Sequence, residues 1–365
     1  MHIDELLKLM ADKGASDLHL RVGGPPVFRI DGQLVTDPDA APLSVEDIQV
    51  SLEAITTPQQ RETFARELEL DFAHAVPSVA RFRVSALRQR GTLAFVFRQV
   101  PFGVPSIDEL KLPAVCRELI LKPRGLILVT GPTGSGKSTT MAAMIDFLND
   151  TESRNIITIE DPIEYLHRNK KCIIAQRALG DDTKSFDIAL THALRQDPDV
   201  IVVGEMRDLA TIATAIRAAE TGHLVMGTLH TTDASQTVDR VIDVFPPNHQ
   251  QQIRLQLSQV LEAVLSQALL PLAVGKGRVG AFEIMIANSA VRNLIREGKT
   301  FELGNIIQLG SREGMQTLNQ ALADLVKKKV VTQEEAMLKS SSPDKLVKLI
   351  QYPTGAPSSM GMGKF

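Results

Sequence analysis

The amino-acid sequence predicts an α/β protein made of two domains, and three observations lead to this prediction. The chain has 365 residues, which is more than one ordinary hydrophobic core holds. Prolines at 101, 105 and 113 mark a segment that can neither join a sheet nor continue a helix. After this segment, short apolar runs alternate with apolar residues at helical spacing, which is typical of a parallel sheet covered by helices.

The composition excludes several classes of protein. A net charge of −3 gives no overall attraction to nucleic acid or to an anionic membrane. Aromatic residues make up 4% of the chain and Trp is absent, which argues against a stacking platform for single strands. The two cysteines, Cys116 and Cys172, cannot form a disulfide framework or a tetracysteine zinc site. The first residues carry acids and lack the basic start of a signal peptide, so we expect a cytoplasmic protein.

Residues 1–100 are expected to form a mixed α/β domain. Apolar residues at helical spacing indicate helices, strict alternation indicates half-buried strands, and Asp-Gly suits a tight hairpin turn. The expected elements are a helix over residues 3–13 that ends at Gly14, a strand over 16–22, a hairpin turning at Asp31–Gly32, a helix over 57–68 with Thr57 as its N-cap, and a hairpin turning at Gly91.

The remaining chain divides into four expected parts. Residues 101–113 are predicted to be a flexible linker, and residues 114–270 a parallel-sheet core. Strand signals thin out after Leu270, so residues 271–352 are expected to be mostly helical. The Gly/Ser/Pro/Met-rich residues 353–365 are predicted to be disordered.

The stretch GPTGSGKS, residues 131–138, matches the phosphate-binding P-loop pattern in full. A strand is predicted directly before it and a helix from about Lys137. Gly134 and Gly136 let the backbone curl so that its N–H groups face the phosphates, at the positive end of the helix. Lys137 would reach the β- and γ-phosphates of ATP, and the hydroxyl of Ser138 would bind Mg²⁺. The predicted nucleotide-binding residues are Gly131, Pro132, Thr133, Gly134, Ser135, Gly136, Lys137, Ser138 and Thr139.

A second predicted strand, NIITI, ends in the acidic stretch EDPIE. Pro162 stops the strand, so Glu160, Asp161 and Glu164 fall at the carboxyl edge of the sheet, where parallel sheets bind ligands. One carboxylate there could polarise a water molecule, and another could hold Mg²⁺ through water. A solvated acidic turn is the alternative, and the neighbouring P-loop favours the functional interpretation.

Two further strands end in polar residues that carry chemistry. The apolar run Val200–Val203 leads to Glu205, as in a Walker B motif with glutamate as its acid. A later strand ends at His230, for which we expect contact with the γ-phosphate or a relay role rather than a packing role in the core. The helix between these strands is predicted to begin after Asp208 and to turn Leu209 and Ile212 inward, together with Ala213 and Ile216.

These four motifs, in this order, resemble those of the secretion-superfamily ATPases, the hexameric motors of type II secretion, type IV pili and type IV secretion. The resemblance implies a PAS-like N-terminal domain joined to a RecA-like ATPase domain, with ATP and Mg²⁺ as ligands. It assigns Glu164 as the catalytic base and Glu205 as the acid near Mg²⁺. It also implies a homohexamer.

The second N-terminal hairpin contains five arginines. A run of arginines in strands is usually a solvated face. Phosphoryl transfer, however, gains greatly from a guanidinium that contacts the γ-phosphate. By the resemblance, Arg83 and Arg98 match the N-domain arginines of the family, and we expect these two to act on the nucleotide.

The stretch AVRNLIREGK, residues 290–299, has helix-spaced apolar residues and places Arg292 and Arg296 on one face. An amphipathic helix packed on its own domain would explain this pattern. The stretch also resembles a signature of the type IV pilus retraction ATPases, which implies that both arginines face a partner or a subunit interface. The implied partner is the inner-membrane platform protein of the pilus, so the motor would be peripheral to that membrane.

Three other functions remain open at this point. The chain could be an accessory retraction ATPase that works beside a paralogue, although the signature in residues 290–299 argues against this. It could be a RecA-type nucleic-acid motor, which its charge and few aromatic residues disfavour. It could also be a ring that uses ATP only to assemble, which the complete acidic motifs disfavour.

Overall fold

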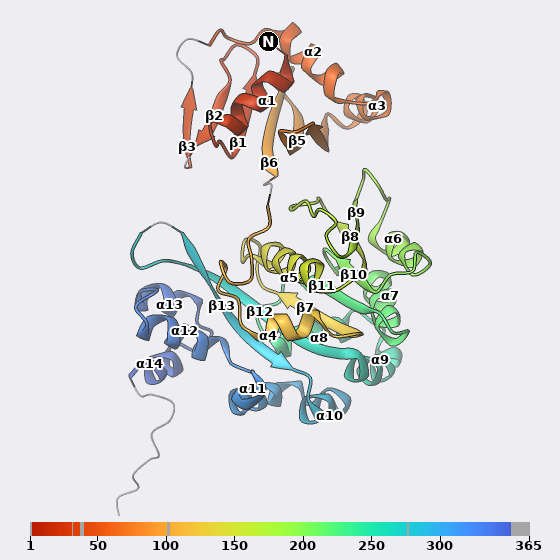
Figure 1. Ribbon diagram of the computed structural model, residues 1–365, viewed down its shortest axis with the longest axis vertical. Coiled ribbons are helices and arrows are strands. Elements are labelled where there is room, and N and C mark those ends of the chain that lie inside the picture. The colour runs from red at the N-terminus through yellow and green to blue at the C-terminus, as the bar shows by residue number, and fades with distance from the viewer. Residues whose placement is uncertain (1, 31, 37–39, 101–102, 276, 352–365) are drawn as a thin grey trace, which may run out of the picture. The chain divides into compact units, whose positions relative to one another are not determined.

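The computed structural model describes residues 2–351 apart from residues 31, 37–39, 101–102 and 276. The chain divides into two compact units (Figure 1). The first unit comprises Met1–Val104, Pro162–His167 and Ala178–Lys184, and the second comprises Pro105–Asp161, Arg168–Arg177 and Ser185–Phe365. No described helix is both long enough and apolar enough to cross a membrane.

The first unit is built on a six-stranded antiparallel sheet with the order β3-β2-β1-β6-β5-β4. Alternate strand residues such as Leu18, Phe82 and Phe97 point to one face and pack there against the helices. The strands are β1 (Asp17–Arg21), β2 (Val27–Ile30), β3 (Gln33–Thr36), β4 (Glu69–Val76), β5 (Ala80–Gln89) and β6 (Thr92–Val100). The helices are α1 (Ile3–Asp12), α2 (Val45–Ile55) and α3 (Pro58–Glu67).

Most elements expected in this unit are present. The predicted apolar face of α1 is fully buried, and Gly14 has φ 62° just past its end. Thr57 caps α3 by accepting a hydrogen bond from the amide of Gln60, with Pro58 as the first helical residue. Both hairpins form, although Asp31 of the first turn lies outside the described residues. Helix α2 and strand β4 were not anticipated from the sequence.

The second unit is built on a seven-stranded sheet with the order β13-β12-β7-β11-β10-β8-β9. The neighbours from β12 through β7, β11 and β10 to β8 are parallel, and β13 pairs antiparallel with β12. The strands are β7 (Gly125–Thr130), β8 (Asn155–Glu160), β9 (Ile173–Ala178), β10 (Val200–Val203), β11 (Leu224–Leu229), β12 (Leu261–Pro271) and β13 (Arg278–Ile286). The predicted α/β fold class is confirmed.

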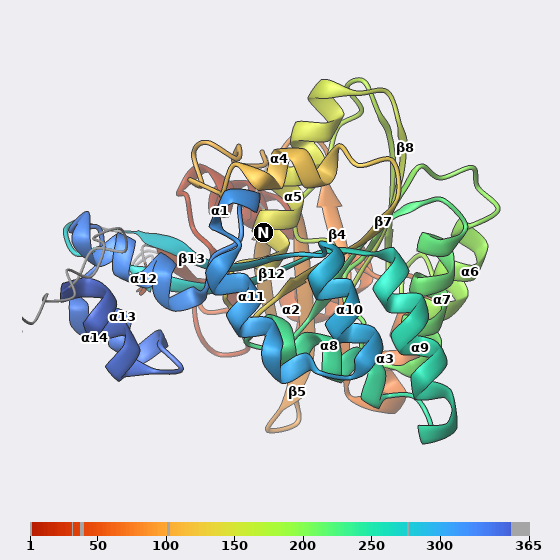
Figure 2. The ribbon, with the colours of Figure 1, turned by 90° about the horizontal axis from the view of Figure 1, so that it is seen from below.

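Helices cover both faces of this sheet, as Figure 2 shows for α4 and α5 on one side and α8 and α10 on the other. Successive residues of β7 therefore enter different cores: Leu126 packs with α7 and α9, and Ile127 with α4 and α5. The helices are α4 (Val115–Ile120), α5 (Lys137–Thr151), α6 (Phe186–Ala193), α7 (Leu209–Glu220), α8 (Ala234–Asp243), α9 (Pro247–Val260), α10 (Ser289–Glu297), α11 (Leu303–Leu309), α12 (Leu318–Lys327), α13 (Gln333–Lys339) and α14 (Pro343–Gln351), with short 3₁₀ turns η1 (Thr300–Glu302) and η2 (Ser311–Glu313).

Two local predictions differ from the structure. The stretch after Leu270 is mostly helical, but it begins with the strand β13, which is held by its partner β12 rather than by a local signal. On α7, Leu209 was expected to face inward, yet it is 41% exposed because it occupies the first turn beside the N-cap Asp208, whereas Ile212 is 1% exposed. Residues 101 and 102 of the predicted linker lie outside the described residues. Residues 353–365, the predicted disordered tail, also lie outside them.

Helix α7 offers a matched pair of variants. We expect Ile212→Ala to lower the free energy of unfolding by about 2–5 kcal/mol, because it leaves a cavity in the core. Leu209→Ala should cost less than about 1 kcal/mol, because much of this side chain is already in water. Denaturant unfolding of both variants measures the difference, and equal losses would contradict the burial pattern.

Candidate nucleotide-binding site

The strands that carry the four motifs end at the same edge of the second unit's sheet. Thr130, the last residue of β7, pairs with Leu229 of β11, and Val203 of β10 pairs with Ile159 of β8. Because these strands are parallel, the residues that follow them emerge side by side. The predicted convergence of the P-loop, Glu205 and His230 at one edge is therefore present.

The P-loop is shaped by glycines that lie close to β12. Gly131, Gly134 and Gly136 have φ angles of 142°, 78° and 92°, which L-residues rarely adopt. A Cβ added at Gly136 would stand 2.7 Å from Nε2 of Gln267, and one at Gly131 would overlap the carbonyl oxygen of Gln267. The amino group of Lys137 donates to the carbonyl oxygens of Gly131, at 2.8 Å, and Pro132, at 3.2 Å. The loop is thus a tight backbone cradle at the start of α5, as phosphate binding requires.

Two polar side chains of β12 form hydrogen bonds with residues on either side of the P-loop. The hydroxyl groups of Ser266 and Thr130 lie 2.8 Å apart, and Thr140 of α5 donates to Oε1 of Gln267 over 2.8 Å. All four side chains are buried. Ser266 and Gln267 were not predicted as site residues; their signal in the sequence was an adjacent polar pair in a strand whose other polar residue is Glu262.

The predicted protein ligands of Mg²⁺ suit an ion whose other ligands come mainly from the nucleotide phosphates. Ser138 is the second residue of α5 and is partly buried, with its hydroxyl at the start of the helix. Among the described residues, no cluster of three or more His, Cys, Asp or Glu side chains could hold a metal ion alone. Mg²⁺ bound to phosphates commonly takes only one or two protein ligands, and Ser138 and Glu205 remain the predicted pair.

Glu205 and His230 are in direct contact. Nε2 of His230 lies 2.7 Å from Oε1 of Glu205, and the guanidinium of Arg207 donates to the same oxygen. His230 is 46% exposed, so it is not a packed core histidine. Burial raises the pKa of the Glu205 carboxyl, but the hydrogen bonds from Arg207 and His230 outweigh burial, and the net pKa is lowered. Glu205 is therefore held as a carboxylate at neutral pH.

Glu160 and Glu164, two acids of the EDPIE stretch, differ in their surroundings. Glu160 ends β8 and accepts hydrogen bonds from Thr158, at 2.6 Å, and Gln176, at 3.1 Å. Glu164 is exposed and lies in the segment Pro162–His167, which belongs to the first unit. The role of Glu164 as the catalytic base remains a prediction.

Arg83 and Arg98 lie opposite each other on β5 and β6 of the first unit. Both are exposed on the sheet face away from the helices. Nε of Arg98 donates to Oδ1 of Asp17 over 2.8 Å. The pair contributes two neighbouring positive charges to this face of the sheet, and its action on a nucleotide remains a prediction.

Arg292 and Arg296 of α10 differ in their surroundings. The guanidinium of Arg292 donates to the carbonyl oxygens of Ser258 and Gln259, both at 2.7 Å, and to Glu262 at 2.9 Å. It therefore caps the end of α9 inside its own unit, a contact that the sequence did not suggest. Arg296 is exposed, and its guanidinium donates to Oδ1 of Asn293 on its own helix, while its carbonyl oxygen accepts from Gln251 of α9. Contact of either arginine with a partner remains a prediction.

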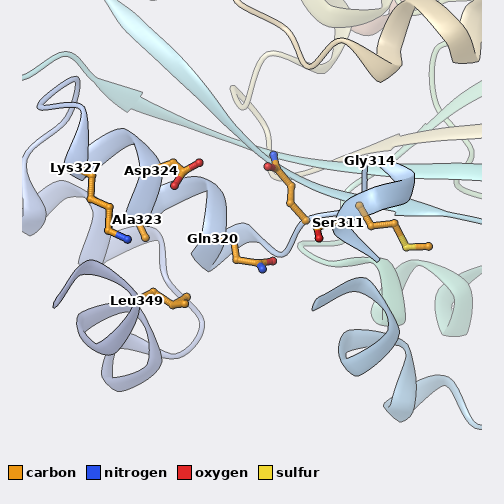
Figure 3. Close-up of a pocket in the computed structure, with 9 residues that line it drawn as sticks. Ser311, Gly314, Gln320, Ala323, Asp324, Lys327 and Leu349 are labelled. Atoms are coloured by element: carbon orange, nitrogen blue, oxygen red, sulfur yellow. The ribbon is translucent and has the colours of Figure 1, made fainter. Parts of the chain in front are cut away.

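A separate cavity of about 270 Å³ lies among the C-terminal helices, and Figure 3 shows residues of α12, α14 and the η2 region around it. Its lining residues are Ser311, Gly314, Met315, Gln316, Gln320, Ala323, Asp324, Lys327 and Leu349. None of them belongs to the four motifs, so this cavity is not the nucleotide site.

Comparison with known proteins gives the same assignment as the motifs. The family model described as "Type II/IV secretion system protein" matches residues 2–275. The chain is 50% identical to the type IV pilus retraction ATPase PilT of Pseudomonas aeruginosa over 94% of this chain and 99% of that protein. It is 40% identical to the type IV pilus ATPase PilU of the same organism over 96% and 92% of the two chains. A crystal structure of the pilus retraction motor PilT with bound ADP superposes with a TM-score of 0.90 and 48% identity, covering 95% and 99% of the two chains.

The chain belongs to the type II/IV secretion system protein family of P-loop ATPases. Within this family it is similar, over nearly its whole length, to the pilus retraction ATPase PilT. The resemblance inferred from the four motifs and from residues 290–299 is therefore confirmed.

The cap formed by Arg292 makes a testable difference between two arginines of one helix. Arg292→Ala should destabilise the protein by about 1–3 kcal/mol, because it leaves two carbonyl groups and Glu262 without this donor. The exposed Arg296→Ala should change the free energy of unfolding by less than about 0.5 kcal/mol. Denaturant unfolding measures both, and a neutral Arg292→Ala would show that the cap does not stabilise α9.

The lowered pKa of Glu205 predicts a pH dependence of stability. The folded protein binds the Glu205 proton less tightly than the unfolded chain does, so ionised Glu205 adds stability above its ordinary pKa of 4.5. This contribution is lost as the pH falls through the lowered pKa. The difference in melting temperature between the wild type and Glu205→Gln should therefore be largest near neutral pH and shrink below pH 4.5. A difference that does not change with pH would contradict the Arg207 and His230 contacts.

Proposed function

We propose that this chain is an ATP-hydrolysing motor that powers retraction of a type IV pilus. The observation that carries the proposal is the convergence of a complete P-loop with the Glu205–His230 pair at one sheet edge. Similarity to the PilT of Pseudomonas aeruginosa and to an ADP-bound PilT structure supports the nucleotide and the biological process.

We assign the predicted site residues separate roles in ATP hydrolysis. The P-loop amides and Lys137 bind the phosphates, with the Lys137 amino group exchanging the carbonyl oxygens of Gly131 and Pro132 for phosphate oxygens. His230, held by the Glu205 carboxylate, is proposed to contact the γ-phosphate. Glu164 is proposed as the base that activates water.

Charge neutralisation completes the proposed reaction. Mg²⁺, held by Ser138 and through water by Glu205, would neutralise charge on the phosphate oxygens. Arg83 and Arg98 are proposed to stabilise the charge that develops on the γ-phosphate in the transition state. Because they come from the first unit, movement of that unit would accompany the nucleotide cycle.

The proposed motor is a homohexamer on the cytoplasmic side of the inner membrane, peripheral to it and bound to the pilus platform protein. The main retraction motor is favoured over an accessory one, because identity to PilT is 50% and to PilU 40%, and because α10 carries the retraction-type signature. A paralogous accessory ATPase is a further proposed partner. Binding to nucleic acid is not proposed.

The proposal is tested in cells whose only copy of the chain carries Glu205→Gln. We expect abundant surface pili and no twitching motility, because pilus assembly continues while removal of pilin stops. A matched variant, the exposed Glu334→Gln on α13, controls for loss of a surface carboxylate and should leave pilus number unchanged. Cells without surface pili would show that the chain drives assembly, and normal pili and motility would contradict a required role in retraction.

A further inference from the structure

Four charged side chains form one row across the sheet of the first unit. The strand register pairs Arg29 of β2 with Asp17 of β1, Asp17 with Arg98 of β6, and Arg98 with Arg83 of β5. The neighbouring residues Leu18, Phe28 and Phe97 are buried in the core with the helices. The charged row therefore points to the opposite face.

The centre of this row is a buried carboxylate. The side chain of Asp17 is only 6% exposed. Oδ1 accepts from Nε of Arg98 over 2.8 Å, Oδ2 accepts from the hydroxyl of Ser16 over 2.8 Å, and Nε of Arg29 lies 3.9 Å from Oδ2. Two guanidinium groups from different strands thus converge on one fixed anion.

The contact leaves the outer part of Arg98 available. Asp17 engages Arg98 through Nε, and no contact among the described residues engages its two terminal nitrogens. The Arg98 side chain is 67% exposed. This geometry orients a guanidinium while keeping its forked end for a second, oxygen-rich anion.

The row carries more positive charge than its own carboxylate neutralises. Three arginines and one aspartate leave a surplus of two positive charges, and Arg83 directly faces Arg98 although like charges opposite each other destabilise a sheet. The pKa of His19, which lies on the same face of β1, is lowered, and burial is the main cause. The positive charges of Arg21, Arg29 and Arg98 lower this pKa further, whereas Asp17 raises it. A doubly charged anion is the ligand that such a row fits.

We propose that Arg29 is a third phosphate-binding arginine beside Arg83 and Arg98, and that Asp17 is the positioning residue that orients Arg98 by a hydrogen bond and forms an ion pair with Arg29, whose Nη1 donates to the carbonyl oxygen of Gly32. The ligand is the terminal phosphoryl group of a nucleoside triphosphate. The inference rests on the proposed ATPase function and adds two residues to it.

The test measures kcat and KM for ATP by phosphate release from the full-length protein. Asp17→Asn and Arg29→Ala should each lower kcat at least tenfold and change KM less than twofold, because the P-loop binds the ground state and the row acts on the transition state. The control is Arg66→Ala, which removes an exposed arginine of α3 in the same unit, outside the row, and should leave both constants unchanged.

Additional variants separate positioning from a merely structural role. In the Arg29→Ala/Arg98→Ala background, adding Asp17→Asn should change kcat less than twofold, because Asp17 acts through those two arginines. An equal loss in both backgrounds would show that Asp17 only maintains the fold. If Asp17→Asn does not fold, Arg29→Ala still decides the inference, because this side chain is 36% exposed.

The outcomes distinguish this inference from the proposed function. If the wild type hydrolyses ATP, Lys137→Ala does not, and Arg29→Ala and Asp17→Asn keep wild-type kcat, the inference is overturned and the ATPase assignment stands. If the wild type itself shows no turnover, the proposed function fails and the inference fails with it.

Discussion

The parallel pairing of β7 with β11, and of β11 with β10, is the constraint on which the candidate site depends. This register places the residue after Thr130 beside the residue after Leu229, and Glu205 follows from the next strand. No side chain has to reach across the molecule, because three separate chain segments end at one edge. The contact between Glu205 and His230, which are 25 positions apart in the sequence, is a direct result.

The other neighbour of β7 serves the same edge in a different way. Strand β12 contributes two buried hydrogen-bond partners on either side of the P-loop: the hydroxyl of Ser266 pairs with that of Thr130, and Oε1 of Gln267 accepts from Thr140. A buried polar group that lacks its partner is costly, so each of these bonds restrains the loop to one conformation. The P-loop is therefore held on one side by hydrogen bonds with β12, and β11, which leads to His230, lies on its other side.

Much of this arrangement could be predicted from the sequence because its signals are local. Helices α1 and α3 follow from apolar spacing and from the cap at Thr57, and the P-loop follows from its glycines and Lys137. What could not be predicted depends on partners distant in the chain. Strand β13 needs β12, and Arg292 finds the end of α9 only in the folded unit. The row through Asp17 exists only through the register of four strands, and no spacing in the sequence reveals it.

The central claim is that this sheet edge hydrolyses ATP, and the most direct measurement is steady-state phosphate release by the purified full-length chain with Mg²⁺ and ATP. We expect turnover by the wild type and its loss in Lys137→Ala, with the variant still folded as judged by its melting temperature. A wild type that binds ATP without releasing phosphate, or a Lys137→Ala variant with wild-type turnover, would contradict it.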